Sequence, residues 1–162
     1  MNINRCKLVR IASDPDMATE QINNAIDALD ACVDYVQAIY PDTVAITYND
    51  DLYPSKVKVK LVRIASDPDI ATDQINEAIE ALGDVSVNDI FGIYPDTVMI
   101  VYSPDYTSNT RVKVIRIASD PDMATEQVNV FIEALYNLYK SATPYIYYLY
   151  SDTLIVMYDY EE

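Results

Sequence analysis

The chain has 162 residues, a formal net charge of −15 and a sequence of which about half is hydrophobic. This length suits one compact domain or a short array of small units, and the hydrophobic content excludes a disordered chain. The charge argues against binding to nucleic acid or to an anionic membrane, and the absence of histidine removes the commonest general base and metal ligand.

One segment occurs three times and organises the chain. The copies occupy residues 9–29, 62–82 and 115–135. A constant spacing of 53 residues separates the arginines near their starts, namely Arg10, Arg63 and Arg116. We therefore expect a single compact domain, residues 1–162, that is built from three tandem repeats. The predicted repeats span residues 5–50, 56–103 and 111–160.

Each repeat opens with a β-branched, roughly alternating run that is typical of a strand: residues 6–12, 57–65 and 112–118. The Ser-Asp-Pro-Asp sequence that follows predicts the start of a helix. Asp14 suits the N-cap, and Pro15 suits the first helical position, where its missing N–H costs nothing. We expect the helix to run to about Asp30, with Ile22 on its apolar face and Asn23 on its polar face.

The copies diverge after the helix and converge again at residues 38–48, 92–102 and 149–158. Tyr-Pro-Asp-Thr in the first two copies is typical of a turn, so we expect a β-hairpin, with a single bent strand as the alternative. A bent strand would give two consecutive repeats the ferredoxin-like order. The predicted class is α+β (α/β-like): three strand-helix-strand(-strand) repeats, ferredoxin-like or pseudo-threefold, whose helices cover a shared sheet.

The second repeat combines residues 58–61, 74–79, 89–90 and 98–102 in one pattern. This pattern resembles that of short proteins encoded by Gram-positive sporulation genes and their phages. The resemblance implies an accessory, non-catalytic protein.

Two cysteines, Cys6 and Cys32, lie in the first repeat and have no counterparts in the others. A disulfide framework would recur with the repeat, so we expect a reducing, intracellular setting. The chain shows no charged-then-apolar leader and no apolar run long enough to cross a bilayer, which predicts a soluble, cytoplasmic protein.

Three arginines are candidates for anion binding. Arg10, Arg63 and Arg116 each lie near the end of an apolar strand and close to a helix N-terminus, where they could meet a nucleotide or another anion. The alternative is that each arginine pairs with an aspartate of its own or a neighbouring repeat.

Six repeated carboxylates are candidates for a hard cation such as Ca²⁺: Asp14, Asp16, Asp67, Asp69, Asp120 and Asp122. Nothing matches the calcium-loop spacing with its glycine, and helix capping explains these residues fully. We therefore expect no metal and no cofactor.

The third repeat departs from the other two. Val130 stands where its sister helices are polar, and a group of tyrosines follows. Tyrosine is enriched at contact surfaces, so we predict a partner-binding or self-association patch here. Its residues are Val130, Tyr136, Tyr139, Tyr145, Tyr147 and Tyr148. The alternative is that a terminal repeat uses bulkier core residues because it lacks a neighbour.

No signature of a nucleophilic elbow, a Cys/His pair or a nucleotide-binding loop is present, which predicts that the chain is not an enzyme. The leading hypothesis is a non-catalytic acidic binding protein that occupies a protein partner, such as a basic or nucleic-acid-binding one, through the third repeat. A phage or mobile-element accessory inhibitor would act in this way. The alternative is a protein that sequesters a nucleotide or another small anion at sites repeated between the units. A designed or recently duplicated sequence without an evolved partner is a third option.

Overall fold

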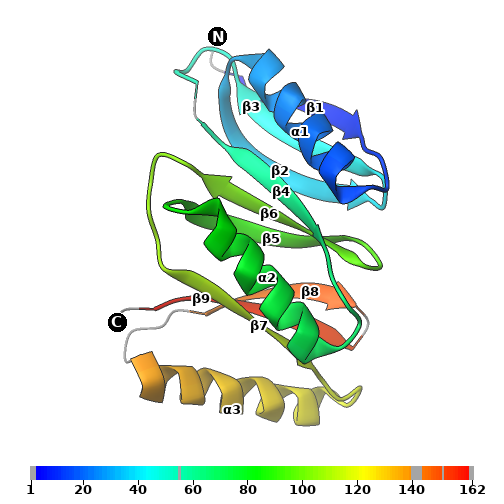
Figure 1. Cartoon of the computed structure of the whole chain (residues 1–162), viewed down its shortest axis with the longest axis vertical. Coiled ribbons are helices and arrows are strands. Elements are labelled where there is room, and N and C mark those ends of the chain that lie inside the picture. Colours follow the sequence, from blue (N-terminus) through cyan, green and yellow to red (C-terminus); the bar gives the residue numbers. More distant parts are fainter. Residues whose placement is uncertain (1–2, 55, 140–143, 151, 161–162) are drawn as a thin grey trace. The chain divides into compact units, whose positions relative to one another are not determined.

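The computed structural model describes residues 3–54, 56–139, 144–150 and 152–160. In these ranges each repeat forms a strand, a helix and two further strands (Figure 1). Repeat 1 contains β1 (Arg5–Arg10), α1 (Pro15–Leu29), β2 (Cys32–Tyr40) and β3 (Thr43–Asn49). Repeat 2 contains β4 (Lys58–Arg63), α2 (Pro68–Leu82), β5 (Ser86–Tyr94) and β6 (Thr97–Ser103). Repeat 3 contains β7 (Thr110–Arg116), α3 (Pro121–Tyr139), β8 (Pro144–Tyr150) and β9 (Thr153–Asp159).

The strands form three separate antiparallel sheets, one for each repeat. Their strand orders are β1-β3-β2, β4-β6-β5 and β7-β9-β8. The α+β class, the three repeats and the hairpin after each helix are confirmed. The sheets are not joined into one shared sheet, and the ferredoxin-like order, which required a single bent strand, is not formed.

The helices begin as the Asp-Pro-Asp sequence predicts. The carboxylate of Asp14 accepts a hydrogen bond of 3.0 Å from the backbone N–H of Met17, and Asp67 accepts bonds of 2.9 and 3.1 Å from Asp69 and Ile70. These carboxylates satisfy backbone donors that have no partner within the helix. Helix α1 ends at Leu29, and Asp30 adopts the left-handed conformation that commonly stops a helix.

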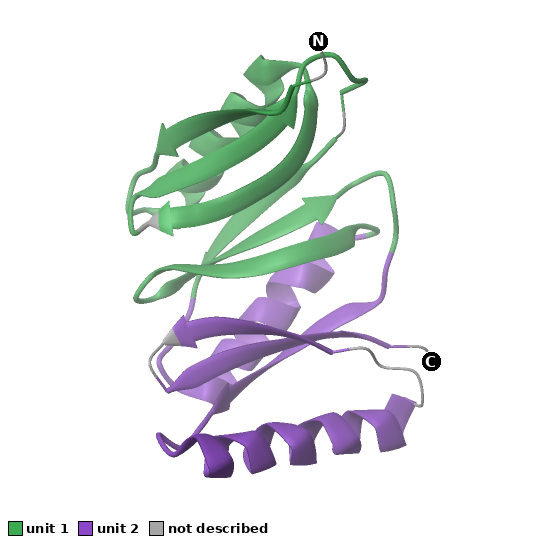
Figure 2. Cartoon of the chain, turned by 180° about the vertical axis from the view of Figure 1, so that it is seen from behind, with its two compact units in different colours: residues 1–63, 84–107 green, residues 64–83, 108–162 purple. Residues whose placement is uncertain are grey.

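The chain divides into two compact units (Figure 2). The first unit, residues 1–63 and 84–107, contains α1 with the sheets of repeats 1 and 2. The second unit, residues 64–83 and 108–162, contains α2 and α3 with the sheet of repeat 3. Helices α1 and α2 are thus each grouped with the first strand of the following repeat, which is β4 for α1 and β7 for α2.

Each unit has its own buried core. In the first unit, Ile22 and Ile26 of α1 pack in one cluster with Ile46 of β3 and with Val59 and Leu61 of β4. The apolar face of α1 therefore packs against the sheet of repeat 1 and against the sheet of repeat 2. In the second unit, Leu135 of α3 packs with Val156 and Tyr158 of β9.

Candidate functional site

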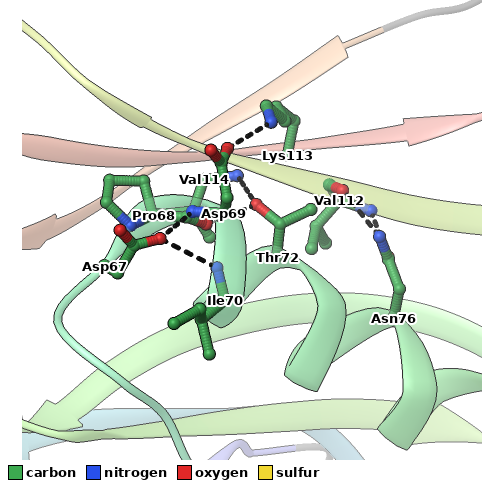
Figure 3. Close-up of polar contacts among 9 residues, drawn as sticks. All are labelled: Asp67, Pro68, Asp69, Ile70, Thr72, Asn76, Val112, Lys113 and Val114. Atoms are coloured by element: carbon green, nitrogen blue, oxygen red, sulfur yellow. Dashed lines mark hydrogen bonds and ion pairs between the residues drawn. The ribbon is translucent and has the colours of Figure 1, made fainter.

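A pair of polar side chains on α2 binds the outer edge of β7 (Figure 3). The amide of Asn76 donates a hydrogen bond of 3.0 Å to the carbonyl oxygen of Val112 and accepts one of 2.8 Å from the N–H of the same residue. One turn earlier on the helix, the hydroxyl oxygen of Thr72 accepts a bond of 2.9 Å from the N–H of Val114. These contacts satisfy backbone groups that an edge strand would otherwise leave unpaired.

The same arrangement occurs one repeat earlier, in the first unit. Asn23 of α1 donates to the carbonyl oxygen of Val59 at 3.0 Å and accepts from its N–H at 2.9 Å. Thr19 accepts from the N–H of Leu61 at 2.9 Å. The two junctions agree within 0.1 Å in every one of these bonds, so strand capture by a helix is a repeated feature of this chain.

Charged side chains flank each junction. Lys113 of β7 pairs with Asp69 of α2 at 3.0 Å, and Lys60 of β4 pairs with Asp16 of α1 at 3.7 Å. These carboxylates are exposed, so each pair contributes little to stability and mainly favours the correct register.

Helix α3 carries the same strand-binding residues, and no described strand is hydrogen-bonded to them. Its residues Asp122, Thr125 and Asn129 occupy the positions of Asp69, Thr72 and Asn76. All three are exposed, and among the described residues none of their side chains is hydrogen-bonded to a strand. We call Asp122, Thr125 and Asn129, with the apolar side chains of Ala124 and Val128, the open face of α3.

The open face is anchored in the same way as its counterparts. Gln127 accepts a hydrogen bond of 2.8 Å from the N–H of Ala118, as Gln74 does from Ala65 at 2.7 Å. The hydroxyl of Thr125 donates to the carbonyl oxygen of Pro121 at 2.7 Å, which leaves its lone pairs available to a strand N–H. A hollow of about 390 Å³ lies along this face, lined by Ile117, Pro121, Ala124, Thr125, Val128, Asn129 and Leu154.

The three candidate arginines are each paired with an aspartate of their own repeat. Arg10, Arg63 and Arg116 lie 3.8, 3.3 and 3.6 Å from Asp42, Asp96 and Asp152. Arg63 and Arg116 also donate to backbone carbonyl oxygens, those of Ser13 at 3.4 Å and Ser66 at 3.3 Å. The structure thus places the arginines in the pairing that was the alternative to anion binding.

The repeated carboxylates are spread over several roles. Asp14, Asp67 and Asp120 accept hydrogen bonds from helix backbone N–H groups, and Asp16 and Asp69 pair with lysines. In the part of the chain that the structure describes, no group of three or more Cys, Asp or Glu side chains is placed to hold a metal ion.

The residues predicted for the third-repeat patch lie in different surroundings. Val130 is 61% exposed and lines a hollow of about 450 Å³ with Ile115, Arg116, Met123, Glu126 and Gln127. Tyr136 is exposed near the end of α3. On β8, side chains of adjacent residues point to opposite faces, so Tyr145 and Tyr147 lie on one face and Tyr148 on the other.

Tyr139 belongs to an aromatic cluster in the second unit. Its ring stacks on Tyr158 with 5.9 Å between centroids and lies 5.4 Å from the ring of Tyr160. Phe131 meets Tyr158 edge-on, and the guanidinium of Arg111 lies 4.9 Å from the centre of the Tyr160 ring. Tyr139 and Phe131 are therefore packing residues of the third repeat, as the alternative to a contact patch predicts.

Helical spacing predicts that Asn23 lies on the polar face of α1, but it does not predict that Asn23 contacts β4. Its side chain is half-buried and bonded to Val59, because the next repeat supplies a strand at that side of the helix. Asparagine is a poor helix former, so its recurrence in the middle of three helices, at positions 23, 76 and 129, is a signal that could have pointed to this role.

Comparison of the chain with family models, curated proteins and solved structures found no match. The resemblance to short sporulation and phage proteins therefore stays a prediction. None of the described helices is both long enough and apolar enough to cross a membrane.

Proposed function

We propose that this chain is a non-catalytic binding protein that captures an exposed β-strand edge of a protein partner on the open face of α3. A captured strand would place two backbone N–H groups opposite Thr125 and Asn129, and one carbonyl oxygen opposite the Asn129 amide. The apolar side chains of the strand would cover Ala124 and Val128.

One observation carries this proposal: the same residue set holds a strand twice elsewhere in the chain. Asn23 and Asn76 each form two hydrogen bonds with one strand residue, and Asn129 presents the same amide from the same helical position. Recognition through main-chain bonds is typical of strand addition to a protein, where side-chain pockets supply the specificity.

The charge of the chain selects among such partners. Asp122 lies where Asp16 and Asp69 each meet a lysine, and the whole chain carries a net charge of −15. The preferred strand therefore carries Lys or Arg next to its exposed backbone groups, and a basic partner also gains from electrostatic steering.

A strand peptide tests the proposal directly. The peptide has the β4 sequence Lys-Val-Lys-Leu-Val-Arg, which α1 binds inside the chain, and is titrated into the ¹⁵N-labelled protein while amide and side-chain NMR shifts are followed. The control peptide is methylated on the backbone nitrogens that correspond to Val59 and Leu61. It keeps every charge and side chain, but it lacks the two backbone N–H groups that would donate hydrogen bonds to Asn129 and Thr125.

We expect saturable shifts around Thr125 and in the Asn129 amide with the first peptide at concentrations up to about 1 mM, and at least tenfold weaker binding of the methylated one. Asn129→Ala should weaken binding of the first peptide to the level of the control. Equal binding of both peptides, or shifts confined to other surfaces, would overturn the proposal.

A further inference from the structure

We infer that the strand edge that fits the open face of α3 is β1 of a second copy of this chain, so that copies associate head to tail. This inference rests on the proposed function and names the partner of the same site. In the part of the chain that the structure describes, three helices carry the strand-capturing residues, and two strands, β4 and β7, are captured. The corresponding first strand of repeat 1 is β1, and no described helix captures it.

The outer edge of β1 is open. It pairs with β3 in the register that β4 uses with β6, with Arg10 opposite Thr43 as Arg63 is opposite Thr97. The backbone groups of Cys6 and Leu8 therefore point outward, and among the described residues no side chain bonds to them. Leu8 is 55% exposed, whereas its counterparts Leu61 and Val114 are 1% and 2% exposed.

The hydrogen-bonding groups on the outer edge of β1 correspond one by one to those on the open face of α3. By their positions in the repeat, Cys6 corresponds to Val59 and Val112 and Leu8 to Leu61 and Val114, so the N–H and C=O of Cys6 would bond to Asn129 and the N–H of Leu8 to Thr125. Lys7 takes the place of Lys60 and Lys113, so it meets Asp122. Arg63 and Arg116 donate to a carbonyl oxygen of the preceding repeat, and among the described residues Arg10 has no such partner, so it would reach the carbonyl oxygen of Ser119 in the second copy.

Exposed apolar side chains gather on the repeats that carry these surfaces. Large exposed hydrophobic residues of repeat 1 include Leu8, Tyr35 and Ile39, and those of repeat 3 include Met123, Val130 and Tyr148. Among the described residues of repeat 2, only Ile70 reaches comparable exposure. Repeat 2 lies between two others in the chain and buries most of its large apolar side chains. The greater apolar exposure of repeats 1 and 3 indicates that each has a surface that another repeat could cover.

The junction between copies buries less apolar surface than the internal ones. The face of β1 and β3 that would meet α3 presents Cys6, Leu8, Ala45 and Thr47, where β4 and β6 present Val59, Leu61, Met99 and Val101. We therefore expect the association between copies to be reversible. Because the two surfaces differ, the contact is heterologous and joins copies into a ring or an open chain.

Variants that block one end each provide the test. Leu8→Lys places a charge on the exposed face of β1, and Asn129→Lys removes the capturing amide from α3. Met17→Lys and Asn137→Lys are the matched controls, because both positions are exposed, lie outside the proposed contact and receive the same charge. Mass is measured by sedimentation equilibrium from about 10 µM to about 1 mM protein in about 0.15 M salt, which screens repulsion between the acidic chains.

The wild-type chain and both controls should rise in average mass with concentration, beyond that of a dimer. Each blocked variant alone should stay at 18.3 kDa. Their equimolar mixture should stop at two chains, because the intact α3 of Leu8→Lys can bind the intact β1 of Asn129→Lys and the other two surfaces are blocked. A wild-type chain that stays monomeric up to about 1 mM, or blocked variants that associate like the controls, overturns the inference. If the strand peptide still binds in that case, strand capture stands and only the identity of the partner is wrong.

Discussion

The side-chain amide of Asn76 forms two hydrogen bonds with the backbone of Val112, and Asn23 forms the same two bonds with Val59. A backbone N–H can only donate and a carbonyl oxygen can only accept, so one amide satisfies both groups of an edge residue at once. Asn129 presents this amide to no strand among the described residues. Within the described ranges the same helix–strand interface is therefore made twice, by α1 with β4 and by α2 with β7.

Replacing the repeated asparagines by alanine should change stability with opposite signs. Asn76→Ala leaves the buried N–H and C=O of Val112 without partners, so we expect the free energy of unfolding to fall by about 2 kcal/mol. Asn129→Ala loses no bond to a described residue and gains helix propensity, so it should raise that free energy by up to about 0.5 kcal/mol. Urea unfolding of dilute protein measures both. Equal losses in the two variants would mean that Asn76 acts through the helix and not through Val112.

The residue after α2 is expected to tolerate only glycine. Gly83 has φ 82° and ψ −142°, a conformation in which a side chain strains the backbone. A Cβ added there would meet nothing within 4 Å, so Gly83→Ala should cost about 1–3 kcal/mol through backbone strain alone. Asp30 holds the equivalent place after α1 with φ 46° and ψ 49°, and Asp30→Gly should be neutral or slightly stabilising. Thermal unfolding of the pair would refute this account if both substitutions cost the same.

Stability should fall at alkaline pH because of Tyr158. Burial raises the pKa of Tyr158 above its usual value, with a further contribution from Tyr139 and an opposing one from Arg111. The unfolded chain then loses the proton at a lower pH than the folded chain does. The stabilisation is fully present below about pH 10 and is lost as pH rises through the folded pKa.

Comparing urea midpoints at about pH 9 and about pH 11 checks this prediction. Tyr158→Phe should lose less stability over that interval than the wild-type chain, since it has no proton to release. Tyr136→Phe is the control, because Tyr136 is exposed. An identical alkaline loss in wild type and Tyr158→Phe would assign the effect to other groups, such as Tyr102, whose pKa burial also raises.

Phe131 should contribute to the stability of the third repeat and not to partner binding. Its ring meets Tyr158 edge-on with 6.5 Å between centroids, and the sister helices carry alanine at this position. Phe131→Ala should therefore cost about 2 kcal/mol, less than a fully buried phenylalanine would. Val130→Ala, one residue away and exposed, should cost almost nothing. If the two changes had equal effects on unfolding, the aromatic cluster would not stabilise α3.

The local structure of each repeat could be predicted from the sequence because local residues determine it. Asp14 and Pro15 define the start of α1, and the alternating pattern together with the Tyr-Pro-Asp-Thr turn defines the hairpin. Pairing of the arginines with aspartates is one of the two expectations from the sequence, but the partner is not predicted: Asp96 lies in the turn between β5 and β6, and the pairing of β4 with β6 brings it next to Arg63.

The junctions could not be predicted from helical spacing. Whether Asn23 faces water or a strand depends on what the next repeat places beside α1, and the spacing within a helix carries no information about that. The division into three sheets also escaped prediction, because a short linker shows that repeats are neighbours but not which edges meet. The open face of α3 is recognised by the match of Asn129 with Asn23 and Asn76, which each bind a strand in the structure.

Zero-length cross-linking of lysine to carboxylate detects contact between β1 of one copy and α3 of another. A carbodiimide is added to an equimolar mixture of ¹⁴N- and ¹⁵N-labelled chains, and the cross-linked peptides are identified by mass. The pair Lys113–Asp69, 3.0 Å apart, provides an internal reference within each chain. We predict that Lys7 is joined to Asp122 in mixed-isotope peptides, which only contact between two copies can produce. Recovery of Lys113–Asp69 without any mixed-isotope Lys7–Asp122 peptide would contradict the account.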